Sequence, residues 1–119
     1  METFTIKTLN DRLNALPAHV VYGQLTGRED WGQKMQELVP LHMRDGFIWW
    51  VALGRTDNLG GFMRAMLEGD LYGTFRKADG INAASMHDWM MFLHNYSPMG
   101  CYGSPERVAA WDGIIKADA

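Results

Sequence analysis

The sequence predicts an all-α protein, a compact bundle of about five or six helices with a short extended arm at the N-terminus. Apolar residues recur at helical spacing in several segments, and residue types that cap helices stand where these segments begin. Short stretches with glycine or proline separate the segments, as in a bundle with short connections. A chain of 119 residues has the length of one domain.

Residues 2–9 alternate apolar and polar side chains around Phe4 and Ile6, which predicts a short extended segment. Because no second strand follows, we expect an arm that lies over the helices. The alternative is that the arm pairs with the arm of a second copy across a two-fold axis. Asn10 then stands as the cap of a short helix that reaches Leu16.

Two further short helices are expected before Pro40. The first covers residues 18–25 and ends at Gly27, because glycine readily takes the left-handed conformation that closes a helix. The second begins with Asp30 as its cap. Its buried face is expected to carry Trp31, Met35 and Leu38.

Residues 40–53 predict a helix that ends at Gly54. Its apolar residues at helical spacing are Met43, Phe47, Trp50 and Val51. Neighbouring residues on a helix point about 100° apart, so one of the two rings of Trp49 and Trp50 is expected at the edge of the core.

Residues 59–78 are the longest periodic segment and predict one continuous helix at the centre of the core. The residues of its expected buried face are Leu59, Phe62, Met63, Met66, Leu67, Leu71 and Phe75. Ala65, Gly69 and Gly73 lie four residues apart and form a strip almost without side chains. We expect a second helix to pack on this strip, either from the same chain or from a second copy.

Two helices complete the expected bundle. One begins at Asn82 or Ser85 and ends before Pro98. Its apolar residues are Met86, Trp89, Met90, Leu93 and Tyr96. The last helix has Ser104 as its cap and Pro105 at its first position, and it is expected to bury Val108, Trp111 and Ile115.

Composition and charge argue against several classes of function. The formal net charge is −3, and no basic run is longer than Arg76-Lys77, so direct binding to nucleic acid is disfavoured. With Cys101 as its single cysteine, the chain can form neither an intrachain disulfide nor a cysteine-based zinc cluster. The longest apolar run, residues 47–53, is far shorter than the roughly 20 residues of a membrane span. Polar residues interrupt the first ten positions, so we expect no secretory signal and a cytoplasmic location.

Two arrangements could support chemistry, but neither has a specific motif. His87 and His94 share a helical face, and a metal site with Asp70, Asp79 or Asp88 is conceivable, although no HExxH pattern is present. Cys101 and His94 could act as nucleophile and base, but no third group orients them, and a half-buried thiol is the simpler interpretation. The sequence therefore predicts no catalytic residue, no bound metal and no cofactor.

Two weaker hypotheses concern anions. Gly60-Gly61 precedes a predicted helix whose first amides could hold an anion with help from Arg64. Arg76 and Lys77, with Tyr72 and Phe75 nearby, could hold a nucleotide between two copies of the chain. The same residues also fit an ordinary solvated helix edge.

Four segments between residues 39 and 111 carry a series of anchor residues: VPLHMRDGFIWWVALGR, GGFMRAMLEGDL, RKADGIN and HDWMMFLHNYSPMGCYGSPERVAAW. With these segments the chain resembles a group of small proteins encoded by bacteriophages, prophages and plasmids. The matching residues are Pro40, His42, Met43, Gly61, Phe62, Ala65, Leu67, Asp70, Leu71, Ala78, Asp79, Asn82, Asn95, Pro98, Gly103, Ser104, Val108 and Trp111. The chain departs from the group at Gly69, where Asn is expected, and at His94-Asn95, where Tyr-Asn is expected.

The resemblance divides the chain into a variable part, residues 1–38, and a family-like helical core, residues 39–116. It implies a phage accessory protein that interferes with host machinery, such as CRISPR or nucleotide-signalling defences. Our first hypothesis is therefore a non-enzymatic, anti-CRISPR-like inhibitor that binds a host or defence protein. The alternatives are an oligomeric binder that sequesters a signalling nucleotide and, third, a metal-dependent enzyme.

The surface expected to bind the partner is apolar and aromatic with a few basic residues. The predicted partner-binding residues are Trp49, Trp50, Arg64, Tyr72, Arg76, Lys77 and Tyr102. We also expect a homodimer, because the glycine strip and the aromatic residues left outside the core need a neighbour.

Overall fold

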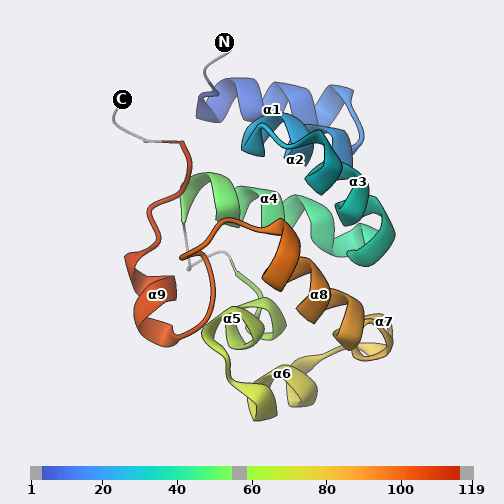
Figure 1. Cartoon of the computed structure of the whole chain (residues 1–119), viewed down its shortest axis with the longest axis vertical. Coiled ribbons are helices and arrows are strands. Elements are labelled where there is room, and N and C mark those ends of the chain that lie inside the picture. Colours follow the sequence, from blue (N-terminus) through green and yellow to red (C-terminus); the bar gives the residue numbers. More distant parts are fainter. Residues whose placement is uncertain (1–3, 55–58, 116–119) are drawn as a thin grey trace.

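The computed structural model describes residues 4–54 and 59–115, which form nine α-helices and one 3₁₀ helix and contain no strand (Figure 1). The elements are α1 (Ile6–Ala15), α2 (Ala18–Thr26), α3 (Glu29–Leu38), η1 (Leu41–Met43), α4 (Arg44–Leu53), α5 (Gly61–Glu68), α6 (Leu71–Lys77), α7 (Gly80–Ala84), α8 (Met86–Tyr96) and α9 (Pro105–Ala110). The all-α prediction is confirmed. The described α-helices outnumber the predicted five or six, in part because residues 59–78 form two helices and Asn82 lies in a short helix of its own.

Helix α4 lies across the middle of the molecule, with α1 to α3 on one side and α5, α8 and α9 on the other (Figure 1). Aromatic rings join these layers. Phe47 of α4 packs against Tyr22 of α2 and Phe92 of α8, with ring centroids 5.9 and 5.4 Å away. Trp89 packs edge-on against Phe47 and also contacts Phe62 of α5. These contacts form the centre of the core.

The predicted extended arm at residues 2–9 is wrong for residues 6–9, which belong to α1, while residues 1–3 lie outside the described residues. Thr5 caps this helix through its side chain, which accepts a hydrogen bond from the backbone N–H of Thr8, and Thr8 bonds back to the backbone of Thr5. This reciprocal capping outweighs the strand preference of threonine. Asn10 consequently lies inside the helix rather than at its cap.

The continuous helix predicted for residues 59–78 is wrong, because the chain forms α5 and α6 with a break between them. Gly69 takes a left-handed conformation with φ of 80° and ends α5. Asp70 then caps α6 by accepting a hydrogen bond from the backbone N–H of Gly73 at 2.9 Å. A glycine that ends one helix, followed by an aspartate that begins the next, interrupts the apolar period.

The strip of Ala65, Gly69 and Gly73 makes contacts within the chain. A Cβ atom on Gly73 would lie 3.3 Å from the Cβ of Ala65, so α6 packs back on α5 at this point. A Cβ atom on Gly69 would lie 3.3 Å from the carbonyl oxygen of Gly103. The strip is thus filled by α6 and the turn before α9.

The other boundaries follow the sequence more closely. Gly27 and Gly54 end α2 and α4 in left-handed conformations, as predicted. Ser104 caps α9 by accepting a hydrogen bond from the N–H of Arg107, and Pro105 occupies the first turn, as predicted. In α3 the cap position belongs to Arg28 and not to Asp30. Of the two predicted starts of the following helix, Ser85 is the N-cap of α8, whereas Asn82 lies in the separate short helix α7.

The segment after α9 crosses the C-terminal end of α4. The last carbonyl groups of α4 accept hydrogen bonds from this segment: Val51 O from the N–H of Ile114 at 3.0 Å, and Ala52 O from the N–H of Ile115 at 2.8 Å. The backbones approach so closely that a Cβ atom on Gly113 would overlap the carbonyl oxygen of Ala52. Gly113 also has a positive φ of 89°, which other residues rarely adopt.

Gly113→Ala should therefore reduce the free energy of unfolding by at least about 2 kcal/mol, because it combines left-handed strain with a backbone overlap. Equilibrium unfolding in urea measures the effect. The control is Gly46→Ala in α4, where an added Cβ meets nothing within 4 Å and should raise stability by about 0.5–1 kcal/mol. Equal effects of the two substitutions would contradict this account of the C-terminal segment.

Candidate functional site

The structure brings three of the seven predicted partner-binding residues together on α6. Tyr72, Arg76 and Lys77 are exposed there, and Tyr72 and Arg76 are one helical turn apart on the same face. Arg64 is exposed on α5, where its guanidinium lies 3.3 Å from the carboxylate of Glu68. Trp49 and Tyr102 are half-buried and pack against the core.

Trp50 does not belong to a surface. Its side chain is 1% exposed, and its indole Nε1 donates a hydrogen bond to the carbonyl oxygen of Cys101 at 3.1 Å. The expectation that one of two neighbouring tryptophans lies at the edge of the core is confirmed, with Trp49 as the outer ring. The assignment of Trp50 to partner binding has no support from this placement.

The outer face of α6 is apolar and exposed. Tyr72 is 89% exposed, Leu71 66% and Phe75 55%. Because residues three and four apart share a helical face, these three side chains are neighbours. We call Leu71, Tyr72, Phe75 and Arg76 the α6 surface. Leu71 and Phe75 were predicted to lie in the core, because the periodicity of residues 59–78 indicated one helix with one buried face.

The position of α6 explains this exposure. Gly73 and Thr74 are buried and face α5, and the hydroxyl of Thr74 donates a hydrogen bond to the carbonyl oxygen of Asp70. The opposite face of the helix therefore points away from the molecule, at whose lower end α6 lies (Figure 1). The next helix, α7, adds Ile81, which is 60% exposed. The sequence does contain a signal for the break between α5 and α6, since Gly69 is a residue that ends helices and Asp70 is a residue that caps the start of the next one.

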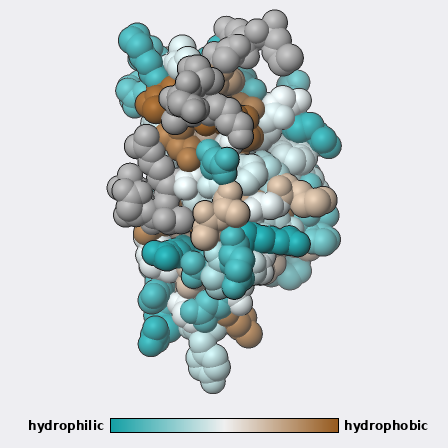
Figure 2. Space-filling model, turned by 90° about the vertical axis from the view of Figure 1, so that its left-hand side faces the viewer, coloured by the Kyte–Doolittle hydropathy of each residue, from teal (hydrophilic) through white to brown (hydrophobic). Residues whose placement is uncertain are grey.

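Figure 2 shows the neighbouring side of the molecule, which carries α9 and the C-terminal segment. Its hydrophobic residues gather in the upper part, and a further hydrophobic group lies near the lower end, at the level of α6. Mostly hydrophilic and neutral residues lie between the two, together with a few of moderate hydrophobicity.

The predicted anion site at Gly60-Gly61 has a different basic neighbour. A Cβ atom on Gly61 would lie 3.0 Å from the Cδ atom of Lys77, so the Lys77 side chain, and not Arg64, lies at the beginning of α5. The basic residues considered for the anion and nucleotide hypotheses thus have different surroundings. Arg64 pairs with Glu68, Lys77 lies over Gly61, and Arg76 belongs to the α6 surface.

His87 and His94 are both exposed on α8. Over residues 4–54 and 59–115, no group of three or more His, Cys, Asp or Glu side chains is arranged to hold a metal ion. Asp70 and Asp79, two of the three carboxylates considered as ligands, instead cap α6 and α7. The geometry of the described residues therefore gives no support to the hypothesis of a metal-dependent enzyme.

Cys101 is fully buried rather than half-buried. Burial raises the pKa of its thiol to about 11. At neutral pH such a thiol is almost entirely protonated, and His94, its proposed base, is exposed on α8. This placement does not suit a nucleophile.

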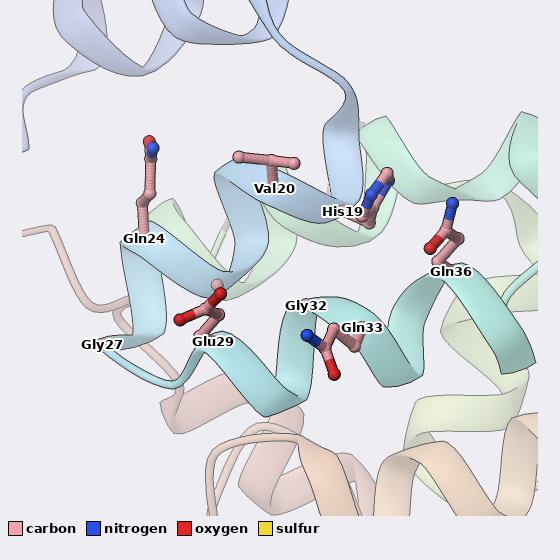
Figure 3. Close-up of a pocket in the computed structure, with 9 residues that line it drawn as sticks. His19, Val20, Gln24, Gly27, Glu29, Gly32, Gln33 and Gln36 are labelled. Atoms are coloured by element: carbon pink, nitrogen blue, oxygen red, sulfur yellow. The ribbon is translucent and has the colours of Figure 1, made fainter.

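A groove of about 620 Å³ lies between α2 and α3 (Figure 3). Its floor consists of the glycines at the contact between the two helices, where a Cβ atom on Gly32 would overlap the carbonyl oxygen of His19. Its lining residues are His19, Val20, Gly23, Gln24, Gly27, Glu29, Gly32, Gln33 and Gln36. No feature of the sequence indicates this groove, because Gly23 and Gly32 belong to different helices and their proximity leaves no pattern along the chain.

Searches against protein-family models, curated proteins and solved structures return no match to this chain. In the part of the chain that the structure describes, no helix is both long and apolar enough to cross a membrane. The site must therefore be interpreted from its own geometry.

Asp79 lies between α6 and α7 in the chain and links the start of α7 to His42 of η1. Its carboxylate accepts a hydrogen bond from the backbone N–H of Asn82 at 2.7 Å and lies 3.0 Å from Nε2 of His42. Mainly through the backbone N–H of Asn82, and also through His42, these hydrogen bonds lower the pKa of Asp79.

The lowered pKa of Asp79 predicts a pH dependence of stability. The ionised carboxylate stabilises the folded state above the pKa of the unfolded chain, about 3.9, and this contribution is lost as pH falls through the lower folded-state pKa. We expect Asp79→Asn, which retains a capping oxygen, to be less stable than wild type at about pH 6, with the difference shrinking towards about pH 3. Urea midpoints measure this, and a difference that stays constant with pH would contradict it.

Proposed function

We propose that the protein is a non-enzymatic binding protein that attaches to a partner protein through the α6 surface. The observation that carries the proposal is the exposure of Leu71, Tyr72 and Phe75 on one short helix. Single exposed apolar residues are normal on a protein surface, but three neighbouring large side chains favour an interaction site. Tyrosine is also enriched among residues that dominate binding energies.

The chemistry of the α6 surface indicates what the partner offers. Burial of Leu71 and Phe75 in an apolar cleft would contribute up to about 1.5–3 kcal/mol for each side chain. Arg76 forms no hydrogen bond or ion pair with another described residue, so its guanidinium is available to a carboxylate on the rim of that cleft. A protein with an apolar cleft and an acidic rim fits both features.

The biological setting of the proposal comes from the resemblance to phage and plasmid proteins. On that ground we propose that the partner is a host or anti-phage defence protein and that binding inhibits it. Sequestration of a nucleotide receives less support, because Arg64, Arg76 and Lys77 have different surroundings. A homodimer stays a prediction whose basis is now the α6 surface, since the glycine strip is filled within the chain.

A pull-down from bacterial lysate tests the proposal. We expect wild type to retain a specific protein and the double variant Tyr72→Ser, Phe75→Ser to lose it, with a decrease in affinity of at least about tenfold in a direct titration. Calorimetry with the purified partner provides that titration. Both side chains are more than half exposed, so the thermal midpoint should change little.

The matched control is Met99→Ser. Met99 is 90% exposed and lies in the turn after α8, outside the α6 surface, so this variant should retain the partner. Retention of the partner by the double variant would contradict the proposal. Light scattering distinguishes a second copy of the chain as the occupant, because the mass of wild type would then be twice that of the double variant.

A further inference from the structure

The α2–α3 groove described above has the dimensions of a ligand site. Its volume of about 620 Å³ lies in the range of small-ligand pockets, roughly 300–1,000 Å³. It lies on the α1–α3 side of α4, whereas α6 lies at the lower end of the molecule (Figure 1). Any ligand bound here would therefore be independent of the partner on the α6 surface.

The walls of the groove favour one ligand chemistry. The nine described residues that line it include three glutamines but no lysine or arginine, and His19 carries the only ring among them. A phosphate would lack a lysine or arginine partner, and a nucleobase would have only the small ring of His19 on which to stack. A glutamine amide offers a donor and an acceptor side by side, as a peptide group does. The lining is therefore suited to a peptide backbone.

One of the three amides is held in a fixed orientation. Nη1 of Arg12 donates a hydrogen bond to Oε1 of Gln24 at 2.7 Å. The same guanidinium lies over the ring of Phe4, 4.6 Å from its centroid. The oxygen of Gln24 is thus engaged by Arg12, and its NH₂ group is the end that remains to donate to a ligand.

The two ends of the groove differ in charge. Glu29 lies at one end, beside the turn between α2 and α3, and His19 and Gln36 lie at the other (Figure 3). The neighbouring Arg28 pairs with Asp30 at 3.8 Å, and Glu29 has no ion-pair partner among the described residues. This carboxylate is available to a cationic group.

The length of the groove sets the size of the ligand. Glu29 and Gln36 are seven residues apart on α3, which corresponds to about 10 Å along the helix axis. About three residues of extended chain cover the same distance. The glycine floor carries no side chain that would hold a peptide backbone away from the helices.

From these features we propose that the α2–α3 groove binds an extended peptide segment of about three residues, with a cationic side chain at the Glu29 end. The glutamine amides bond to the peptide groups, and Glu29 pairs with the cation. The proposal does not depend on the function assigned to α6.

Titration of ¹⁵N-labelled protein with acetyl-Lys-Gly-Gly-amide tests it. The side-chain NH₂ signals of Gln24, Gln33 and Gln36 report on the groove directly. They should shift together with the backbone signals of Gly23 and Gly32. The NH₂ signal of Asn95, which donates to the carbonyl oxygen of Met91 on α8, is the internal control and should not move.

Two comparisons make the test specific. Acetyl-Glu-Gly-Gly-amide should bind more weakly than the lysine peptide, and Glu29→Gln should reduce affinity for the lysine peptide by about two- to five-fold, as for an exposed ion pair. Tyr72→Ser should bind the peptide as wild type does, so a failure here is distinguishable from a failure at α6. Absence of shifts at millimolar peptide, or equal affinity for both peptides, would overturn the proposal.

Discussion

The structure depends on the hydrogen bonds between the C-terminal half of α4 and the segment that runs from Cys101 to Ile115. Indole Nε1 of Trp50 donates to Cys101 O, and indole Nε1 of Trp111 donates to Trp50 O, both at 3.1 Å. The last carbonyl groups of a helix have no partner within it, and here the amides of Ile114 and Ile115 supply two of them. Residues about sixty positions apart are joined in this way, which places α9 against α5 and fixes the lower half of the molecule.

The break between α5 and α6 determines which residues meet the solvent. If residues 59–78 continued as one helix, Leu71 and Phe75 would extend the buried face of Phe62 and Met66. Because Gly69 ends α5 and Asp70 caps α6, the second half turns back on the first and presents the opposite face outward. Gly69 and Asp70 are thus the reason that apolar residues spaced as for a buried helix face lie on an exposed surface. The α2–α3 groove arises from a different local cause, the close approach of two helices through Gly23 and Gly32.

The features that could be predicted were those encoded by short sequences. Gly27 and Gly54 were correctly predicted to end helices, and Ser104-Pro105 to begin one, because each depends only on residues next to it in the chain. Thr5 and Thr8 were misassigned because threonine also favours strands, and only their mutual hydrogen bonds show the helix start. Tyr72, Arg76 and Lys77 were predicted as partner-binding residues. Leu71 and Phe75 were assigned to the buried face because their apolar period continued that of α5, although Phe75 was also considered beside a nucleotide. The groove depends on the tertiary packing of two helices, which no local pattern records.

The central claim, that the outer face of α6 is where a partner protein binds, is tested most directly by hydrogen–deuterium exchange of the protein with and without its purified partner. The account predicts that the partner slows exchange in residues 71–77, while α2 and α3 remain unchanged. Slowed exchange elsewhere, with residues 71–77 exchanging as fast as in the free protein, would contradict it.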